Sequence, residues 1–68
     1  MEAKSKNFYV GKEIQLYPQD TYKKFGVVTL MDEAGFVVKI TKAHEKSGYE
    51  VNKEYFFSHS AGLRFKFV

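Results

Sequence analysis

The chain has 68 residues and contains neither cysteine nor tryptophan. A chain of this length forms one domain, and it buries only about 60% of the surface that its unfolded form exposes, so its core must be dense. The absence of cysteine rules out disulfides and thiolate metal sites, which argues against a stapled secreted scaffold and favours a reducing, cytoplasmic setting. No apolar run approaches the ~18 residues of a membrane span.

Charge and aromatic content narrow the function classes only slightly. Eleven basic and eight acidic side chains give a net charge of +3. Such a balance suits a nucleic-acid partner, but it also describes many soluble proteins. The seven Phe and five Tyr residues supply core density, because one buried ring hides roughly 150–250 Å².

The beginning of the chain predicts a short lead and a first strand. Residues 1–7 are polar, and we expect them to form a flexible lead before a single domain over residues 8–68. The first strand is predicted over residues 10–17, with Ile14 and Leu16 on one face. That alternation has the period of two that marks a half-buried strand.

The middle of the chain predicts a hairpin. A second strand is expected over residues 25–31, although its apolar residues fit either face, so the sequence leaves the buried face open. Residues 32–35 are expected to form the turn, with Gly35 free to take a positive φ. A third strand over residues 36–42 alternates between apolar and polar side chains.

The last third of the chain predicts two more strands. The fourth combines residues 49–51 and 55–57 around a short interruption, and residues 58–62 are expected to form one turn of 3-10 helix. The fifth covers residues 63–67. Five short strands in so few residues cannot cover both faces of an open sheet, which predicts an all-β, five-stranded small barrel.

The order of these pieces resembles an SH3-like small barrel of the KOW or Tudor type. The resemblance rests on residues 10–14 (VGKEI) as the opening strand, residues 25–28 (FGVV) as the second strand, and residues 58–62 as the 3-10 turn before the last strand. An OB-like barrel is the alternative. The resemblance implies a domain that binds nucleic acid, ribosomal components or short peptides.

A basic and aromatic outer face is the main functional hypothesis. Cations neutralise phosphates, and stacking of a base on an aromatic ring contributes about 1–3 kcal/mol. The residues expected to contact RNA or DNA by shape and charge are Lys23, Lys24, Lys39, Arg64 and Lys66, with Tyr17 and Tyr22 as stacking rings. The competing interpretation is that these side chains are only the solvated sides of strands, which need charge for solubility.

A protein-interaction or inhibitor module that modulates a larger machine is the second hypothesis. Tyr22 and Phe56 would carry it. Phe56 and Phe57 are adjacent, so they face opposite sides of a strand, and Phe56 is either covered by a bulge or by the lead, or exposed for binding. A homodimer through the last strand is a further possibility within this hypothesis.

An enzyme is not expected. His59 stands between Ser58 and Ser60 in a tight turn, where neighbours rarely aim at one another, and the hydroxyls are expected to cap the turn instead. His44 and His59, without cysteine or paired carboxylates, are not a ligand set. We therefore predict no catalytic residue, no metal and no cofactor.

Overall fold

Residues 9–68 fold into one antiparallel sheet and a single turn of 3-10 helix. The structure is a computed structural model that describes residues 9–68, so the predicted lead over residues 1–7 lies outside the described residues. The elements in chain order are β1 (Glu13–Leu16), β2 (Lys24–Met31), β3 (Gly35–Ala43), β4 (Glu54–Ser58), η1 (His59–Ala61) and β5 (Phe65–Phe67). The predicted all-β class and the 3-10 turn before the last strand are confirmed.

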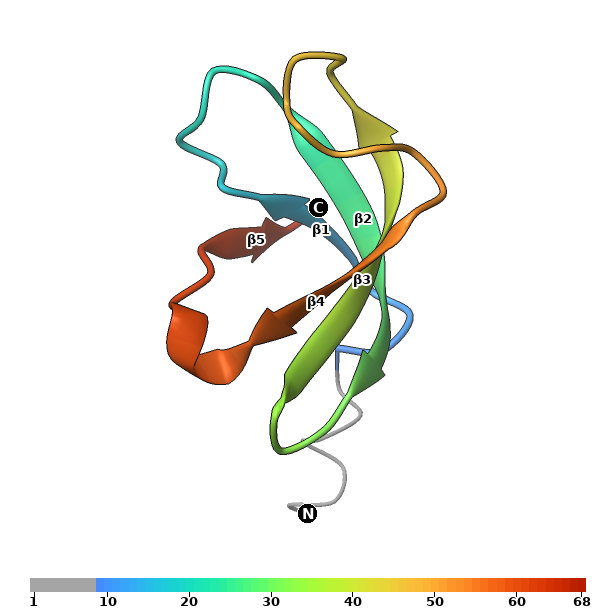
Figure 1. Cartoon of the computed structure of the whole chain (residues 1–68), viewed down its shortest axis with the longest axis vertical. Coiled ribbons are helices and arrows are strands. Elements are labelled where there is room, and N and C mark those ends of the chain that lie inside the picture. Colours follow the sequence, from blue (N-terminus) through green and yellow to red (C-terminus); the bar gives the residue numbers. More distant parts are fainter. Residues whose placement is uncertain (1–8) are drawn as a thin grey trace.

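The sheet is curled but open. Its strands lie in the order β4-β3-β2-β1-β5, and every neighbouring pair is antiparallel. β4 and β5 are therefore the two edges, and η1 connects them across the open side (Figure 1). No ladder joins these edges within residues 9–68, so the closed barrel expected from the sequence is not formed. The three-residue β5 is used entirely in pairing with β1.

The core lies on the inner face of β1, β2 and β3. Its buried apolar members alternate along β1 and β3, as predicted, because successive side chains of a strand point to opposite faces. They are Ile14, Leu16, Val28, Phe36, Val38 and Ile40. Each such side chain contributes about 1.5–3 kcal/mol on burial. A ring of half-buried side chains surrounds this centre, and most of them are aromatic.

β2 resolves the register that the sequence leaves open. Gly26 and Val28 point inward, and β3 passes so close to Gly26 that a Cβ there would lie 2.8 Å from the Lys39 carbonyl oxygen. A register shift then falls between Val28 and Leu30. Such a bulge reverses the direction of the following side chain, and Leu30 is accordingly 51% exposed on the outer face.

The β2–β3 connection is a hairpin turn, as predicted, but its glycine is needed for a different reason than the one expected. The Asp32 Oδ1 accepts hydrogen bonds from the N–H groups of Ala34, at 2.9 Å, and Gly35, at 3.1 Å. Gly35 does not take a positive φ, so that expectation is wrong. The residue must lack a side chain because the Phe57 carbonyl of β4 occupies the place of a Cβ.

Three predicted strands are shorter than expected. The last covers only Phe65–Phe67 instead of residues 63–67. β1 covers only Glu13–Leu16, because residues 9–11 form a turn before it and Tyr17 takes a φ of 47° that ends the extended chain. Residues 49–51 belong to no strand, since a turn with a φ of 73° at Asn52 precedes β4. Ser58 caps η1 as predicted, since its Oγ accepts the N–H of Ser60 at 3.3 Å.

Candidate nucleic-acid interface

One row of side chains crosses four strands on the outer face of the sheet. Lys42 of β3 lies opposite Phe25 of β2. Gln15 of β1 lies opposite both Phe25 and Lys66 of β5. Directly opposite residues of antiparallel strands point to the same face. Since Phe25 precedes the inward-pointing Gly26, that face is the outer one.

This row is cationic at both ends and aromatic between them. The Lys42 Nζ lies 5.7 Å from the centroid of the half-buried Phe25 ring, within the range of a cation–π contact. Gln15 is buried because it lies between the longer side chains of Phe25 and Lys66. With strands about 4.8 Å apart, the backbones of Lys42 and Lys66 are separated by roughly 14 Å.

Two more cations extend this surface toward one end of the sheet. The Lys23 carbonyl accepts the N–H of His44 at 2.9 Å, and the Arg64 carbonyl accepts the N–H of Tyr17 at 2.7 Å. These bonds continue the β2–β3 and β1–β5 pairing by one step. Lys23 is two residues from Phe25, and Arg64 is two residues from Lys66, so alternation keeps both on the outer face, where both are exposed. We call Lys23, Lys42, Arg64 and Lys66 the basic cluster.

Lys39 lies outside the basic cluster. It is exposed on the outer face as predicted, but it stands in the next row across the sheet, directly opposite Glu54 of β4 and Val27 of β2. Val27 in turn lies opposite Glu13 of β1. Two carboxylates therefore share this row with one ammonium group, and they offset its attraction for phosphate.

Lys24 has a structural role instead of the predicted phosphate contact. Its residue is only 3% exposed, because β2 directs it to the inner face. The Nζ donates to the Tyr22 carbonyl at 2.8 Å and pairs with the Asp20 carboxylate at 3.1 Å. It also lies 5.7 Å from the centroid of the Tyr17 ring. The contacts of this ammonium group therefore stabilise the loop between β1 and β2.

The two tyrosines predicted to stack on bases differ in position. Tyr17 is half-buried and packs against the core, so it does not share the outer surface. Burial raises the pKa of the nearby Tyr49 hydroxyl above its usual value, and Tyr17 adds to this rise by its charge and a hydrogen bond. Tyr22 remains on the surface at 39% exposure, with its ring centroid 4.7 Å from that of His44.

Phe56 is exposed and is not covered by a bulge, which agrees with the interpretation that it is available for binding. It points outward from β4 with 56% of its surface accessible, while its neighbour Phe57 packs against the core. The Phe56 ring lies over Gly35, since its Cζ would be 2.9 Å from a Cβ built there. The absence of a side chain at Gly35 therefore leaves room for the Phe56 ring.

The residues around η1 serve the turn. The His59 Nε2 lies 2.9 Å from the Asp32 carbonyl oxygen, and because a carbonyl only accepts, this nitrogen donates. The hydroxyls of Ser58 and Ser60 are 2.9 Å apart and bond to each other. The imidazole is thus tied to the β2–β3 turn and does not face either hydroxyl as a base would.

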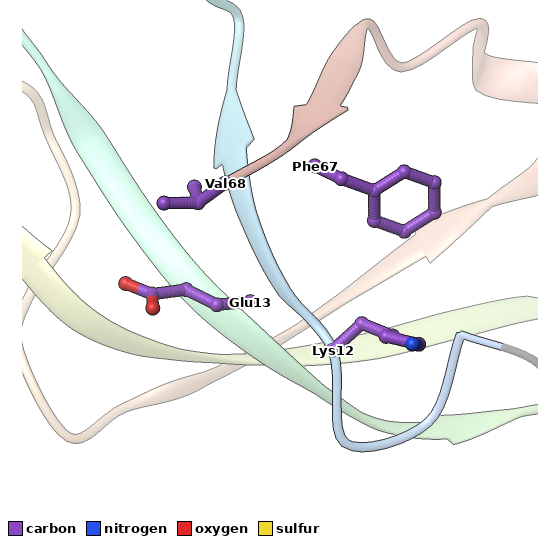
Figure 2. A pocket seen from close by; sticks show the side chains of 4 residues that line it. All are labelled: Lys12, Glu13, Phe67 and Val68. Carbon is purple, nitrogen blue, oxygen red and sulfur yellow. The ribbon is translucent and has the colours of Figure 1, made fainter.

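A small pocket lies at the end of β1 beside the last residues of the chain. It has a volume of about 200 Å³ and is lined by Lys12, Glu13, Phe67 and Val68. Figure 2 shows Glu13 and Val68 on one side of β1, with Lys12 and Phe67 on the other. Small-molecule sites usually have about 300–1,000 Å³. Over residues 9–68, no group of three His, Asp or Glu side chains is placed to hold a metal ion.

No protein-family model, curated protein or solved structure matches this chain. Within the described part of the chain, no helix has the length and apolar character needed to cross a membrane. The candidate site therefore rests on the geometry of the sheet.

Sequence reasoning missed Phe25 and Lys42 as members of the outer face. The alternation of residues 23–28 fits either register, so it does not reveal whether Phe25 or Gly26 faces the core. The signal that decides is Gly26, because a glycine inside a strand often marks the close approach of another backbone. That approach fixes Gly26 inward and Phe25 outward.

Proposed function

We propose that this protein binds nucleic acid through the basic cluster, with Phe25 as a stacking platform at its centre. The observation that supports this function is the arrangement around one aromatic ring. Cations from the β2, β3 and β5 regions surround Phe25, and the row through it contains no acidic residue. Such a surface neutralises phosphates without reading base edges, so recognition is by shape and charge.

Single-stranded RNA or DNA fits this surface better than a duplex. The bases of a single strand are free to stack on the accessible part of the half-buried Phe25 ring, and a base stack of this kind contributes about 1–3 kcal/mol. The chain has no helix of the kind that enters a major groove within residues 9–68. The function proposed is thus that of a non-enzymatic module, acting alone or within a nucleoprotein complex, in the reducing cytoplasm that a cysteine-free chain suits.

Salt-dependent binding tests the proposal. Labelled single strands and matched duplexes are titrated with the protein, and fluorescence anisotropy is measured at about 50 mM and about 200 mM salt. Four phosphate contacts predict a slope of log K against log salt near −3, which is roughly a 50-fold loss of affinity over this range. Absence of binding at the lower salt concentration contradicts the function.

Two neutralised variants locate the contact. Lys42→Gln and Lys66→Gln should each reduce the salt slope by about 1. Lys53→Gln is the matched control, because Lys53 is an exposed lysine in the turn before β4, 3.8 Å from the Glu50 carboxylate. Equal losses for all three variants would show that only net charge matters.

Phe25→Leu tests the stacking platform separately. The variant keeps an apolar side chain but loses the ring, so single-strand affinity should fall about 5- to 100-fold, while duplex affinity should change little. Phe56→Leu removes an exposed ring elsewhere on the same face and serves as the control. An unchanged affinity of Phe25→Leu, with the lysine effects intact, would leave charge as the sole determinant.

The fold class that we infer is SH3-like, with the five-stranded sheet curled but open. Two observations support the SH3-like type over the OB-like alternative. The first four strands form a meander, and β5 pairs with β1 after a turn of 3-10 helix.

Protein binding is a second candidate function. It is favoured by the exposure of Phe56 on β4 and of Tyr22 near the other end of the sheet. These two aromatic residues are separated along the sheet, so each would be part of a different contact. Loss of partner binding in Tyr22→Ala, at a salt concentration that abolishes nucleic-acid binding, would test the second contact independently of the basic cluster.

A further inference from the structure

An apolar row crosses three strands of the outer face, at the end away from the basic cluster. Phe56 of β4 lies opposite Val37 of β3, and Val37 lies opposite Leu30 of β2. Phe56 is 56% exposed and Leu30 is 51% exposed. Val37, which lies between them, is half-buried. A contiguous apolar patch on a sheet face is a common feature of interaction sites.

The part of the neighbouring row on β3 and β4 carries one charge of each sign. Lys39 of β3 and Glu54 of β4 lie directly opposite each other in the ladder. Opposite charges at such positions often pair. Yet no ion pair joins these two side chains in the part of the chain that the structure describes, and both are exposed. The face therefore presents an ammonium group and a carboxylate side by side, next to the apolar row.

We propose that this face binds a second copy of the chain. A two-fold axis parallel to the strands, midway between β3 and β4, places β3 of each copy against β4 of the other. Phe56 then meets Val37 of the second copy, and Glu54 meets Lys39 of the second copy. Two-fold symmetry repeats both contacts. Sheets packed in this aligned manner lie about 10 Å apart with their strands within about 30° of each other.

Charge complementarity identifies the occupant. A partner surface of one charge sign would meet one attractive and one repulsive group on this face. The same face turned by the two-fold axis meets two attractive pairs. The contact also leaves β1, β2 and β5 of each copy uncovered, so Phe25, Arg64 and Lys66 stay accessible. Lys42 of β3 lies beyond Lys39–Glu54, the last pair of the β3–β4 ladder. The dimer and the nucleic-acid interface therefore use different parts of the same face.

The contact is small, because it covers two strands of each copy. It belongs at the low end of specific interfaces, below about 1,200 Å² in total. We expect dissociation in the micromolar to millimolar range, so sedimentation velocity is measured on nucleic-acid-free protein from about 10 μM to about 1 mM. The wild-type chain should show a reversible monomer–dimer equilibrium in this range.

Reciprocal charge variants provide the decisive test. Lys39→Glu alone places two carboxylates against each other in both inter-chain contacts, and Glu54→Lys alone places two ammonium groups there. Each variant should therefore dimerise at least about tenfold more weakly than the wild type. An equimolar mixture of the two should restore dimers, since both inter-chain pairs are then attractive. Circular dichroism confirms that each variant is folded.

The matched control uses the same charge changes on strands outside the contact. Glu13→Lys and Lys66→Glu lie on β1 and β5. Each should dimerise like the wild type, and mixing them should give no preference for a mixed dimer. Phe56→Ser should weaken the dimer without a charge change.

Three results overturn the proposal. A wild-type chain that is monomeric up to about 1 mM leaves the apolar row to a different protein. A dimer that is unaffected by both single charge variants uses another surface, such as the β5 edge. A mixture of Lys39→Glu and Glu54→Lys that does not associate more strongly than either variant alone excludes the two-fold arrangement.

Discussion

Replacement of Lys24 by methionine should lower stability and leave nucleic-acid affinity nearly unchanged. Methionine keeps the apolar stem on the inner face but removes three contacts of the ammonium group. A charged hydrogen bond to the Tyr22 carbonyl contributes about 1.5–3 kcal/mol. The pair with Asp20 adds at most about 1 kcal/mol because that carboxylate is half-exposed, and the Tyr17 ring adds about 0.5–1 kcal/mol. Methionine avoids the desolvation of a buried cation, so the net loss should be about 2 kcal/mol.

Thermal unfolding measures this loss. For a domain of this size, about 2 kcal/mol corresponds to a decrease in Tm of roughly 8–16 °C. Lys23→Gln is the matched control, because its neighbouring ammonium group is exposed in the basic cluster. That variant should keep its Tm and lose salt-dependent affinity. The reverse result, with Lys24→Met weakening nucleic-acid binding at unchanged Tm, would refute the structural assignment of Lys24.

Three further predictions concern stability and ionisation. Gly35→Ala should destabilise the fold by about 1–3 kcal/mol in urea unfolding, because a Cβ would collide with the Phe57 carbonyl; an unchanged midpoint would contradict the close approach of β4. Asp32→Ala should lose about 1 kcal/mol with the two turn hydrogen bonds, whereas Asp32→Asn, which keeps the acceptor oxygen, should lose less. Burial raises the pKa of the Tyr49 hydroxyl in the folded chain above its unfolded value of about 10. The protonated hydroxyl therefore stabilises the fold fully at pH values below about 10, and this stabilisation is lost as the pH rises through the higher folded pKa. Ultraviolet titration should show one late tyrosine that Tyr49→Phe removes.

Period-two alternation was sufficient to predict which residues of β1 and β3 are buried. Ile14 and Leu16 in β1, and the alternate apolar residues of β3, are buried as the pattern requires. These positions are predictable because burial on one face is enforced by the pleat itself. The ends of strands are less predictable, because a single non-glycine residue with a positive φ, Tyr17, ends β1.

The inner position of Lys24 was not predictable from local pattern. A lysine is almost never fully buried unless it is paired, so alternation alone favours an exposed Lys24. Its partners are the Asp20 carboxylate and the Tyr22 carbonyl, which belong to the loop between β1 and β2. Only the folded loop brings them to the ammonium group. The same loop draws the Tyr17 ring inward and removes it from the outer surface.

Two register shifts between β2 and β3 create both proposed surfaces. If the ladder between Gly26 and Ile40 continued regularly, Phe25 would face Thr41; the shift between Phe25 and Gly26 places Lys42 there instead. At the other end, regular pairing would put Leu30 on the inner face opposite Phe36. The shift after Val28 moves Leu30 to the outer face, where it extends the apolar row.

These shifts explain why the outer face divides into a basic part and an apolar part. Each shift inserts one residue, Thr41 on β3 at one end and Thr29 on β2 at the other, and each reverses which neighbour faces outward. The sequence alternates well on either side of the shifts, so composition alone does not locate them.

The inserted residue of β3 offers a direct test of this register. Deletion of Thr41 lets Lys42 follow Ile40 directly, and regular pairing then keeps Lys42 opposite Phe25. Salt-dependent binding should therefore be retained in the deletion variant, and self-association should be retained with it, because the apolar row lies at the other end of the sheet. If the wild-type ladder were regular instead, Lys42 would point inward, and the same deletion would bring it to the outer face. A clear gain in single-strand affinity, with a steeper salt slope, would thus contradict the register on which the basic cluster depends.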